Sequence, residues 1–291
     1  MVKFKKLKQR DDKLWCIKIT DLATGIKGKA YTKFVCIGAG GGSLPLLEKA
    51  NVPEGKGYGG FPVSGQKLKC INPEVITKHK VKVYGKASVR APPMSVPHIN
   101  SRMINGEKQL LFGPFAGFST RFLKNGSYSD LPLSIKADNI IPMIAAGVKN
   151  IPLTKYLINQ MRQSPNDRIK ALREYVPGAK SKDWVLKRAG QRVQVIKKDE
   201  KEGGILEFGI EVITTADGTL FVLLGASQGA STAVLIMVDL ITRCFKDEIE
   251  TPEWQEKLKI MIPSYGQTLN DNPTLLDETR QNTATILKLN N

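Results

Sequence analysis

A glycine-rich turn at residues 34–50 is the stretch of this chain whose residue types are best suited to chemistry. Its sequence, FVCIGAGGGSLPLLEKA, runs from an apolar segment through a cluster of glycines into a short amphipathic helix. A strand, turn and helix of this kind leave backbone N–H groups free at a positive helix N-terminus, where a phosphate or a cofactor edge can bind. The dinucleotide fingerprint is flawed, because Ser43 replaces the third glycine and no acidic residue follows about twenty positions on. The turn therefore predicts a supporting wall of a nucleotide site, not its primary phosphate grip.

A second turn of this type lies in the last third of the chain. There ADG joins two apolar runs into a hairpin, and the second run leads through GASQGAST into an apolar helix. The two turns, at Gly38 and Gly225, bracket a long insert of strands and helices. We therefore expect residues 1–51 and 190–291 to form one domain and residues 52–189 another. Tight packing between strand and helix would also require glycine at either turn.

The segment GASQG offers an alternative from a different class. It matches the nucleophile elbow G-x-S-x-G of α/β-hydrolases, with Ser227 as the nucleophile. In that fold an acidic residue and then a histidine follow the serine along the chain. The two histidines of this sequence, His79 and His98, both precede Ser227. Because no histidine follows to act as the base, hydrolysis is the weaker reading.

Both strands and helices are predicted around these turns, which indicates an α/β fold. Alternating or continuous apolar patterns predict strands at 13–20, 28–37, 75–90 and 94–115, and again from residue 190. Apolar residues at three- and four-residue spacing predict helices at 139–146, 153–162 and 165–175. The insert thus combines an antiparallel sheet with helices.

Composition places the chain among ordinary globular proteins. At 291 residues and 41% hydrophobic content it can bury a substantial core. The four cysteines lie too far apart for a zinc site, so we interpret them as small core residues in a reducing, cytoplasmic compartment. Apolar runs are too short to span a membrane, so any membrane contact is expected to be peripheral, on the inner face of the cell membrane.

The formal net charge of +17 would attract nucleic acid, anionic lipid or acidic metabolites. Most basic residues are scattered singly, apart from the stretches at 3–10 and 78–86. His79, in the second stretch, is expected to be exposed. Since no nucleic-acid-binding motif accompanies the charge, no nucleic-acid partner is expected.

Several long blocks of this sequence resemble the malate:quinone oxidoreductase family. They are FVCIGAGGGSLPLLEKANVPEGKGYGGFPVSGQ, VYGKASVRAPPMSVPHINSR, LLFGPFAGFSTRFLKNGS, DWVLKRAGQRVQVIKKD, LLGASQGASTA and, near the end, IPSYGQTL. Five positions depart from the family pattern. They are Ser43 where Ala is usual, Asn100 where Asp is usual, Ser101 and Ile210 where Thr is usual, and Gln228 where Pro is usual.

The resemblance implies an FAD enzyme of the tricarboxylic acid cycle that oxidises malate to oxaloacetate and passes electrons to membrane quinone. It also implies a glutathione-reductase-like FAD-binding domain with an inserted substrate domain. The matching blocks correspond to the C-terminal part of such an enzyme, without the N-terminal βαβ unit that grips the ADP part of FAD. We therefore also expect that the chain could be an inactive fragment, or a subunit completed by a partner chain.

Oxidation of a 2-hydroxy acid needs a base for the hydroxyl proton, clamps for the carboxylates and a flavin N5 that accepts the hydride. On the resemblance, His98 is the candidate base, and Arg192 is the arginine that would hold a substrate carboxylate over the ring. Gln194 would project from the same strand face, and Arg102 could hold the second carboxylate. A structural histidine and surface ion pairs are the alternatives for these residues.

For the flavin, the resemblance implies close backbone approach at the first turn and a helix N-terminus near the pyrimidine edge at the second. A positive helix end there would stabilise negative charge at N1 and O2 of the reduced ring. The residues expected to bind the cofactor are Gly38, Gly40, Gly41, Gly225, Ala226, Ser227, Gly229 and Ala230.

Overall fold

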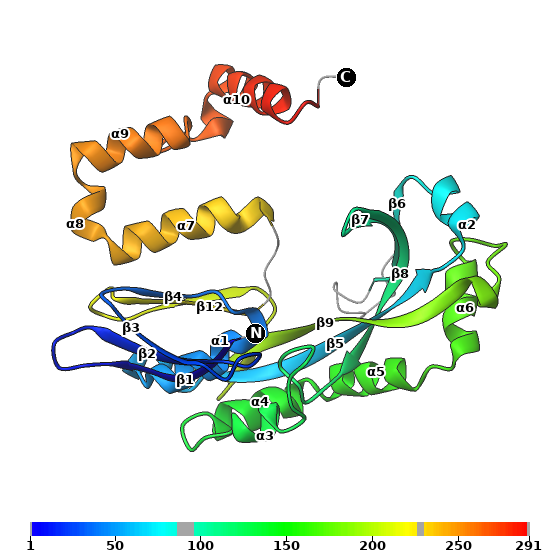
Figure 1. Cartoon of the computed structure of the whole chain (residues 1–291), viewed down its shortest axis with the longest axis horizontal. Helices are drawn as coiled ribbons and strands as arrows, with labels where there is room; N and C mark the ends of the chain where they lie inside the picture. The colour runs from blue at the N-terminus through cyan, green and yellow to red at the C-terminus, as the bar shows by residue number, and fades with distance from the viewer. Residues whose placement is uncertain (1, 86–95, 226–229, 290–291) are drawn as a thin grey trace. The chain divides into compact units, whose positions relative to one another are not determined.

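The computed structural model describes residues 2–85, 96–225 and 230–289 (Figure 1). By its internal contacts the chain divides into two compact units, Met1–Gly229 and Ala230–Asn291. Helices and mostly antiparallel sheets occur together, which confirms the predicted α/β class. The described strands all belong to the first unit, whereas the second is helical.

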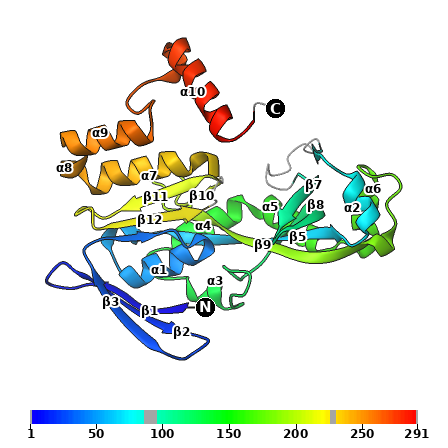
Figure 2. The ribbon, with the colours of Figure 1, turned by 45° about the horizontal axis from the view of Figure 1, so that its top comes forward.

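A three-stranded antiparallel sheet opens the first unit (Figure 2). Its strands, in spatial order, are β1 (Val2–Gln9), β2 (Trp15–Asp21) and β3 (Lys27–Thr32). Leu7 and Trp15 are buried in one core cluster with Leu44 and Leu47 of helix α1 (Ser43–Ala50). Because side chains alternate along a strand, this burial turns one face of the sheet to the core and leaves the intervening residues on the outer face.

A six-stranded antiparallel sheet forms the middle of the first unit. In spatial order its strands are β10 (Ile205–Glu207), β9 (Trp184–Lys197), β5 (Gly59–Cys70), β8 (Glu107–Phe118), β7 (His98–Ile104) and β6 (Lys82–Tyr84). β5, β8 and β9 are the long strands, and the register shifts near Gln66 on both sides of β5. Such bulges bend a strand and increase its twist.

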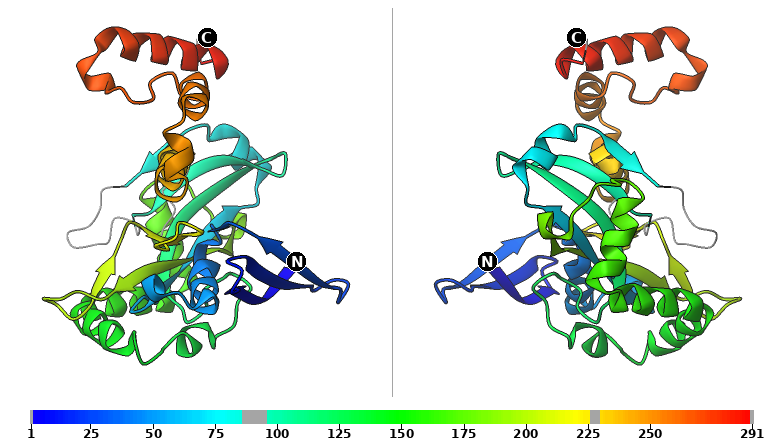
Figure 3. Two further views of the ribbon diagram at one scale, coloured as in Figure 1. Left: turned by 90° about the vertical axis from the view of Figure 1, so that its left-hand side faces the viewer. Right: turned by 90° about the vertical axis from the view of Figure 1, so that its right-hand side faces the viewer.

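Helices pack against this sheet and supply its core. They are α2 (Pro73–Lys78), α3 (Asp130–Leu133), α4 (Ile140–Lys149), α5 (Ile151–Arg162) and α6 (Pro165–Arg173). Phe61 of β5 packs with Leu157 of α5, and Phe112 of β8 packs with Leu172 of α6. Helices α4 and α5, in green, run alongside the strands in Figure 3. The three long helices confirm the predictions made from apolar spacing.

The third sheet joins distant parts of the chain. Its strands, in spatial order, are β11 (Ile210–Thr214), β12 (Leu220–Gly225) and β4 (Val35–Ile37). β11 and β12 form the hairpin predicted around ADG. β12 pairs with β4 in parallel, with Leu220 opposite Val35. This pairing places the end of β12 beside the glycine-rich turn that follows β4.

The hairpin turn is tied to the first sheet by Asp217. Its carboxylate accepts hydrogen bonds from the Gln9 amide at 2.9 Å and from the Thr215 and Thr219 hydroxyls at 2.7 and 2.8 Å. Burial alone would raise the pKa of Asp217, but these hydrogen bonds outweigh it and lower the pKa to about 2. The carboxylate is therefore ionised across the physiological pH range.

Two predicted strands differ from the structure. The segment predicted at 28–37 is divided between β3 and β4, which lie in different sheets, and the break falls where the Thr32 hydroxyl donates to the Phe34 carbonyl at 3.0 Å. The segment predicted from residue 75 begins inside helix α2. Asn72 caps that helix by accepting from the Glu74 N–H, and Pro73 occupies its first turn. Local capping thus overrides the alternating pattern.

Single residues also differ from expectation. Cys16 and Cys70 are buried as predicted, but Cys36 is exposed because it alternates with buried Ile37 on β4, an edge strand. His79 is half-buried at the C-terminal end of α2, not exposed.

The second unit consists of helices α7 (Ala230–Cys244), α8 (Lys246–Ile249), α9 (Pro252–Met261) and α10 (Pro273–Ile286). Its buried apolar residues, among those described, are Leu240, Ile249 and Leu258. Within the described residues no helix is both long and apolar enough to cross a membrane.

Candidate functional site

The first glycine-rich turn contains glycines with two different structural roles. A Cβ added at Gly38 or at Gly40 would meet no atom within 4 Å, so the backbone there is open to a ligand. Gly40 also has a φ of +55°, which favours glycine. By contrast, a Cβ at Gly41 would collide with the carbonyl group of Phe122 and contact Val193. Gly41 therefore permits packing, and only the other two glycines offer open backbone.

Ser43, which replaces the third glycine of the fingerprint, closes the same turn. Its side chain is fully buried, and its hydroxyl accepts a hydrogen bond from the Ala39 N–H at 2.9 Å. The serine thus satisfies a backbone donor that would otherwise be free for a ligand.

The second turn meets the first. Gly225 has a φ of +84°, and a Cβ there would lie 2.6 Å from the Gly209 carbonyl oxygen, so conformation and packing both require glycine. A narrow crevice, which we call the glycine crevice, collects residues from both turns and from two strands of the large sheet. It is lined by Gly40, Leu44, Gly59, Val193, Val195, Leu224 and Gly225. The structure therefore brings together two predicted cofactor turns that are far apart in the sequence.

The rest of the second turn is described only in part. Ala226, Ser227 and Gly229 lie outside the described residues, and so do the predictions made for them. The apolar helix predicted after this turn is α7, which begins at Ala230.

Arg192 and Gln194 lie on β9, on either side of the crevice residue Val193. Arg192 is half-buried opposite Val63 of β5, and burial lowers the pKa of its guanidinium. Gln194 is only 1% exposed, and its amide N–H donates to the Glu207 carbonyl at 2.9 Å. Its amide oxygen, Oε1, is buried and has no hydrogen-bond partner among the described residues. An unsatisfied buried acceptor of this kind is costly and suggests a missing donor.

His98 is the first residue of β7, which lies toward the opposite edge of the large sheet from β9. Its ring lies 4.9 Å from the ring of Tyr84, and the Lys82 ammonium lies 4.7 Å over the same Tyr84 ring. Burial lowers the pKa of His98, and the nearby charges of Lys67, Lys82 and Arg102 lower it further. The imidazole is therefore neutral at pH 7 and able to accept a proton.

The Nδ1 atom of His98 lies 3.4 Å from the carbonyl oxygen of Val96. Since a carbonyl can only accept, this contact favours the tautomer with the proton on Nδ1. The lone pair is then on Nε2, which is the atom that would act as base.

Asn100 and Arg102 continue the face of β7 that carries His98, because alternate residues share a face. Asn100 is 4% exposed, yet its Nδ2 donor has no partner in the part of the chain that the structure describes. Arg102 is exposed opposite Gln109. Lys67 approaches from β5, where its Cγ lies 3.3 Å from the Cβ position of Gly113, the strand neighbour of His98. We call the set His98, Asn100, Arg102, Lys67 and Lys82 the cationic cluster.

The structure does not bring His98 and Arg192 together. His98 of β7 pairs with Gly113 of β8, which adjoins Lys67 of β5. Lys67 in turn pairs with Lys187 of β9, which lies five residues before Arg192. With a strand spacing of about 4.8 Å and a rise of about 3.3 Å per residue, the two residues lie roughly 20 Å apart along the sheet. One four-carbon acid cannot reach both. Arg192 is on the face of β9 opposite that of the crevice residues Val193 and Val195, whereas Arg102 shares a face with His98.

Sequence reasoning missed Lys67, Lys82 and the unpartnered donor of Asn100. Lys67 follows the block FPVSGQ, and Lys82 lies in the basic stretch 78–86. Their convergence depends on strand register, which the pattern of a single strand does not contain.

Among the described residues, no group of three or more His, Cys, Asp and Glu side chains could hold a metal ion. The site therefore offers cations and amides, which suit an anionic ligand.

Comparison with known proteins identifies the family. Residues 1–289 match the family described as Malate:quinone oxidoreductase (Mqo). This chain belongs to the malate:quinone oxidoreductase family. A relative named probable malate:quinone oxidoreductase from Flavobacterium johnsoniae is 76% identical over 285 residues, which are 98% of this chain and 57% of the relative. Relatives of the same name are 56% identical in Wolinella succinogenes (97% of this chain, 57% of the relative) and 55% identical in Geobacillus kaustophilus (98% and 56%).

The chain thus spans a little over half the length of the malate:quinone oxidoreductases it matches. Family membership also disfavours the hydrolase reading of Ser227.

Proposed function

We propose that this chain carries the malate-binding surface and one flavin wall of an FAD-dependent enzyme that oxidises malate to oxaloacetate and passes the electrons to membrane quinone. The relatives' names supply malate and quinone. The observation that carries the proposal is the cationic cluster, where a neutral His98 and an unpartnered Asn100 donor lie among Lys67, Lys82 and Arg102. A dicarboxylate would supply both the negative charge and the acceptor that this surface lacks.

Four members of the cluster have roles toward malate in this proposal. Nε2 of His98 accepts the hydroxyl proton. Nδ2 of Asn100 donates to a carboxylate oxygen, while Lys67 and Arg102 stabilise the carboxylate charges. Because burial and, to a lesser extent, the surrounding cations disfavour a protonated imidazole, His98 keeps its lone pair until the substrate's negative charge arrives.

One edge of FAD is assigned to the two glycine turns that meet at the glycine crevice. Gly38 and Gly40 of the first turn leave open backbone there. When bound, FAD would supply the acceptor for the hydride that leaves the alcohol carbon. Arg192 lies on the face of β9 opposite that of the crevice residues and far from His98, so this proposal gives it no contact with malate, which differs from the substrate clamp expected from the sequence. Gly225 would contribute to the same wall, and Ala226, Ser227, Gly229 and Ala230 stay predicted contacts.

The predicted domain division remains part of the proposal. Residues 1–51 and 190–291 would belong to the FAD-binding domain, and residues 52–189 would form the substrate domain. Both outer segments contribute to the glycine crevice, which Gly59 of the middle segment also lines. Since quinone dissolves in lipid, we also propose peripheral contact with the inner face of the cell membrane.

An absorbance experiment tests the proposed function directly. The purified chain is incubated with FAD, excess is removed, and the retained flavin band is followed on adding malate. Retention with bleaching by malate supports the proposal. Lactate is the matched control, because it has the hydroxyl group but lacks the second carboxylate, so it should bleach the band far more slowly. A flavin band that malate does not bleach, or a chain that retains no flavin, would contradict the proposal. Either result is the one expected for an inactive fragment.

A further inference from the structure

The outer face of the first sheet carries an unusual row of lysines. Lys6 of β1 is opposite Lys18 of β2, and Lys18 is in turn opposite Lys29 of β3. In the next row Lys8 is opposite Cys16, which is opposite Tyr31. We call Lys6, Lys18 and Lys29 the lysine row. It includes Lys6 from the basic stretch at 3–10, which the proposed function does not use.

This row is electrostatically unfavourable in the free protein. Like charges directly opposite each other on neighbouring strands destabilise a sheet. Within the described residues, no ion pair is found for any lysine of the row. Two acidic groups interact with residues next to the row: Asp12 pairs with Arg10 at 3.0 Å, and Asp217 accepts from Gln9. An anion bound across the row would therefore relieve repulsion as well as gain attraction.

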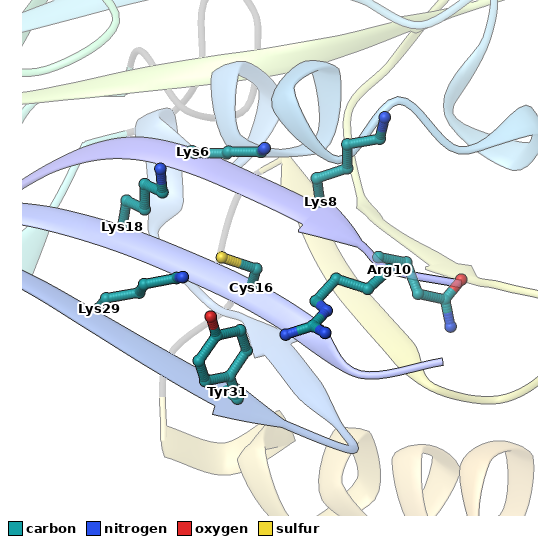
Figure 4. A pocket seen from close by; sticks show the side chains of 8 residues that line it. Lys6, Lys8, Arg10, Cys16, Lys18, Lys29 and Tyr31 are labelled. Carbon is teal, nitrogen blue, oxygen red and sulfur yellow. The ribbon is translucent and has the colours of Figure 1, made fainter. Parts of the chain in front are cut away.

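The row lines a pocket with a volume of about 210 Å³ (Figure 4). Its lining is Lys6, Lys8, Gln9, Arg10, Cys16, Lys18, Lys29 and Tyr31. Five of these eight residues are cationic, and none is acidic. The Tyr31 ring is covered by two of the cations, with Arg10 at 4.9 Å and Lys29 at 4.7 Å from its centre. These cation–π contacts hold the Arg10 and Lys29 side chains at the pocket.

We propose that this pocket binds a phosphate group. A phosphate monoester carries about two negative charges and a phosphodiester headgroup carries one, and both present several acceptor oxygens that can contact the ammonium groups of the row. The pocket has room for the phosphate with a small substituent, such as a glycerol. The group belongs either to a free phosphate ester or to the headgroup of an anionic lipid. The site lies on the β1–β3 sheet and is independent of the proposed malate chemistry.

The test compares two charge-matched variants of the whole chain. Lys18→Gln removes the centre of the row, and Lys5→Gln removes an equal charge from the same sheet but outside the pocket. Thermal unfolding is measured in phosphate and in chloride at equal ionic strength, and binding of glycerol 3-phosphate is measured by titration calorimetry. The wild type and Lys5→Gln should bind alike, whereas Lys18→Gln should bind about tenfold more weakly or not at all. In chloride, Lys18→Gln should unfold at a higher temperature than wild type, because the repulsion is gone.

Sedimentation with vesicles identifies the source of the phosphate. Vesicles of phosphatidylglycerol are compared with vesicles of phosphatidylcholine for the same three proteins. Vesicle binding that is lost in Lys18→Gln but kept in Lys5→Gln assigns the site to lipid, and soluble binding alone assigns it to a free ester. Equal losses in the two variants would mean that only net charge matters and would overturn the proposal. So would the absence of binding to either probe.

Discussion

At the scale of single residues, unsatisfied buried polar atoms occur on strands toward both edges of the large sheet. Asn100 of β7 lacks a partner for its amide nitrogen in the cationic cluster, and Gln191 and Gln194 of β9 lack one for their amide oxygens. Buried polar groups in folded proteins are nearly always hydrogen-bonded. The unpartnered donor of Asn100 therefore suggests a ligand surface at the cationic cluster.

His98 and His79 form a matched pair for testing general base catalysis. His98→Gln should lower the rate of malate-dependent flavin bleaching by about 100-fold, because Nε2 no longer accepts the proton. His79→Gln should leave the rate unchanged. Because burial and nearby cations lower the pKa of His98 from its ordinary value of 6.5, the wild-type rate should stay constant above pH 6.5 and fall only below it. Equal rates for the two variants at pH 7 would exclude His98 as the base.

Asn100→Leu should separate stability from binding. Leucine has a similar size and removes the unpartnered Nδ2, so the free energy of unfolding in urea should rise by about 1 kcal/mol. Malate binding should weaken by about tenfold, because one hydrogen bond to a carboxylate is lost. A variant that loses stability and keeps its malate affinity would show that Asn100 has a structural role instead.

At the scale of elements, the turn between β4 and α1 shows how adjacent glycines serve packing and ligand access separately. The polypeptide approaches Phe122 so closely at Gly41 that no side chain fits, while the space beside Gly38 is open. The expectation that all three glycines face the flavin therefore fits Gly38 and Gly40 better than Gly41.

Gly41→Ala and Gly38→Ala test this division. Gly41→Ala should lower the free energy of unfolding by about 2–3 kcal/mol, because a rigid backbone carbonyl must move to accommodate the new methyl group. Gly38→Ala should change stability by less than about 0.5 kcal/mol but reduce FAD retention. Urea unfolding and the retained flavin absorbance give the two readouts. The division would fail if the two variants changed stability equally.

The sequence predicted the elements whose signals are local. Apolar spacing located α4, α5 and α6, and the ADG turn located the hairpin of β11 and β12. It could not predict that β4 pairs with β12 or that Lys67 lies near His98, because both depend on register between distant strands. It also mistook the start of α2 for a strand, where the capping side chain of Asn72 determines the structure.

At the scale of the whole molecule, the two units differ in how much apolar surface they bury. The first unit has three core clusters, whereas the second buries Leu240, Ile249 and Leu258 among its described residues. Helix α10 contains no buried residue. Since helical stability in proteins comes mostly from packing of an apolar face, the second unit should be the less stable.

Hydrogen exchange should show this difference. Backbone amides of α9 and α10 should exchange at least about tenfold faster than those of β5 and β9, because local opening costs less where few side chains are buried. Mass spectrometry of peptides from the intact chain provides the measurement. Equal protection of the two units would contradict the assignment of low stability to the second.

The parallel pairing of β4 with β12 has a consequence for biosynthesis. Val35 and Leu220 are 185 residues apart, so the ribosome must synthesise the whole large sheet between them before the two strands can meet. Contacts between such distant segments form late, because closing a long loop costs entropy before any pairing compensates for it. The glycine crevice needs both strand ends. The nascent chain can therefore form this crevice only after β12 has been made, when the large sheet and its helices have had time to fold.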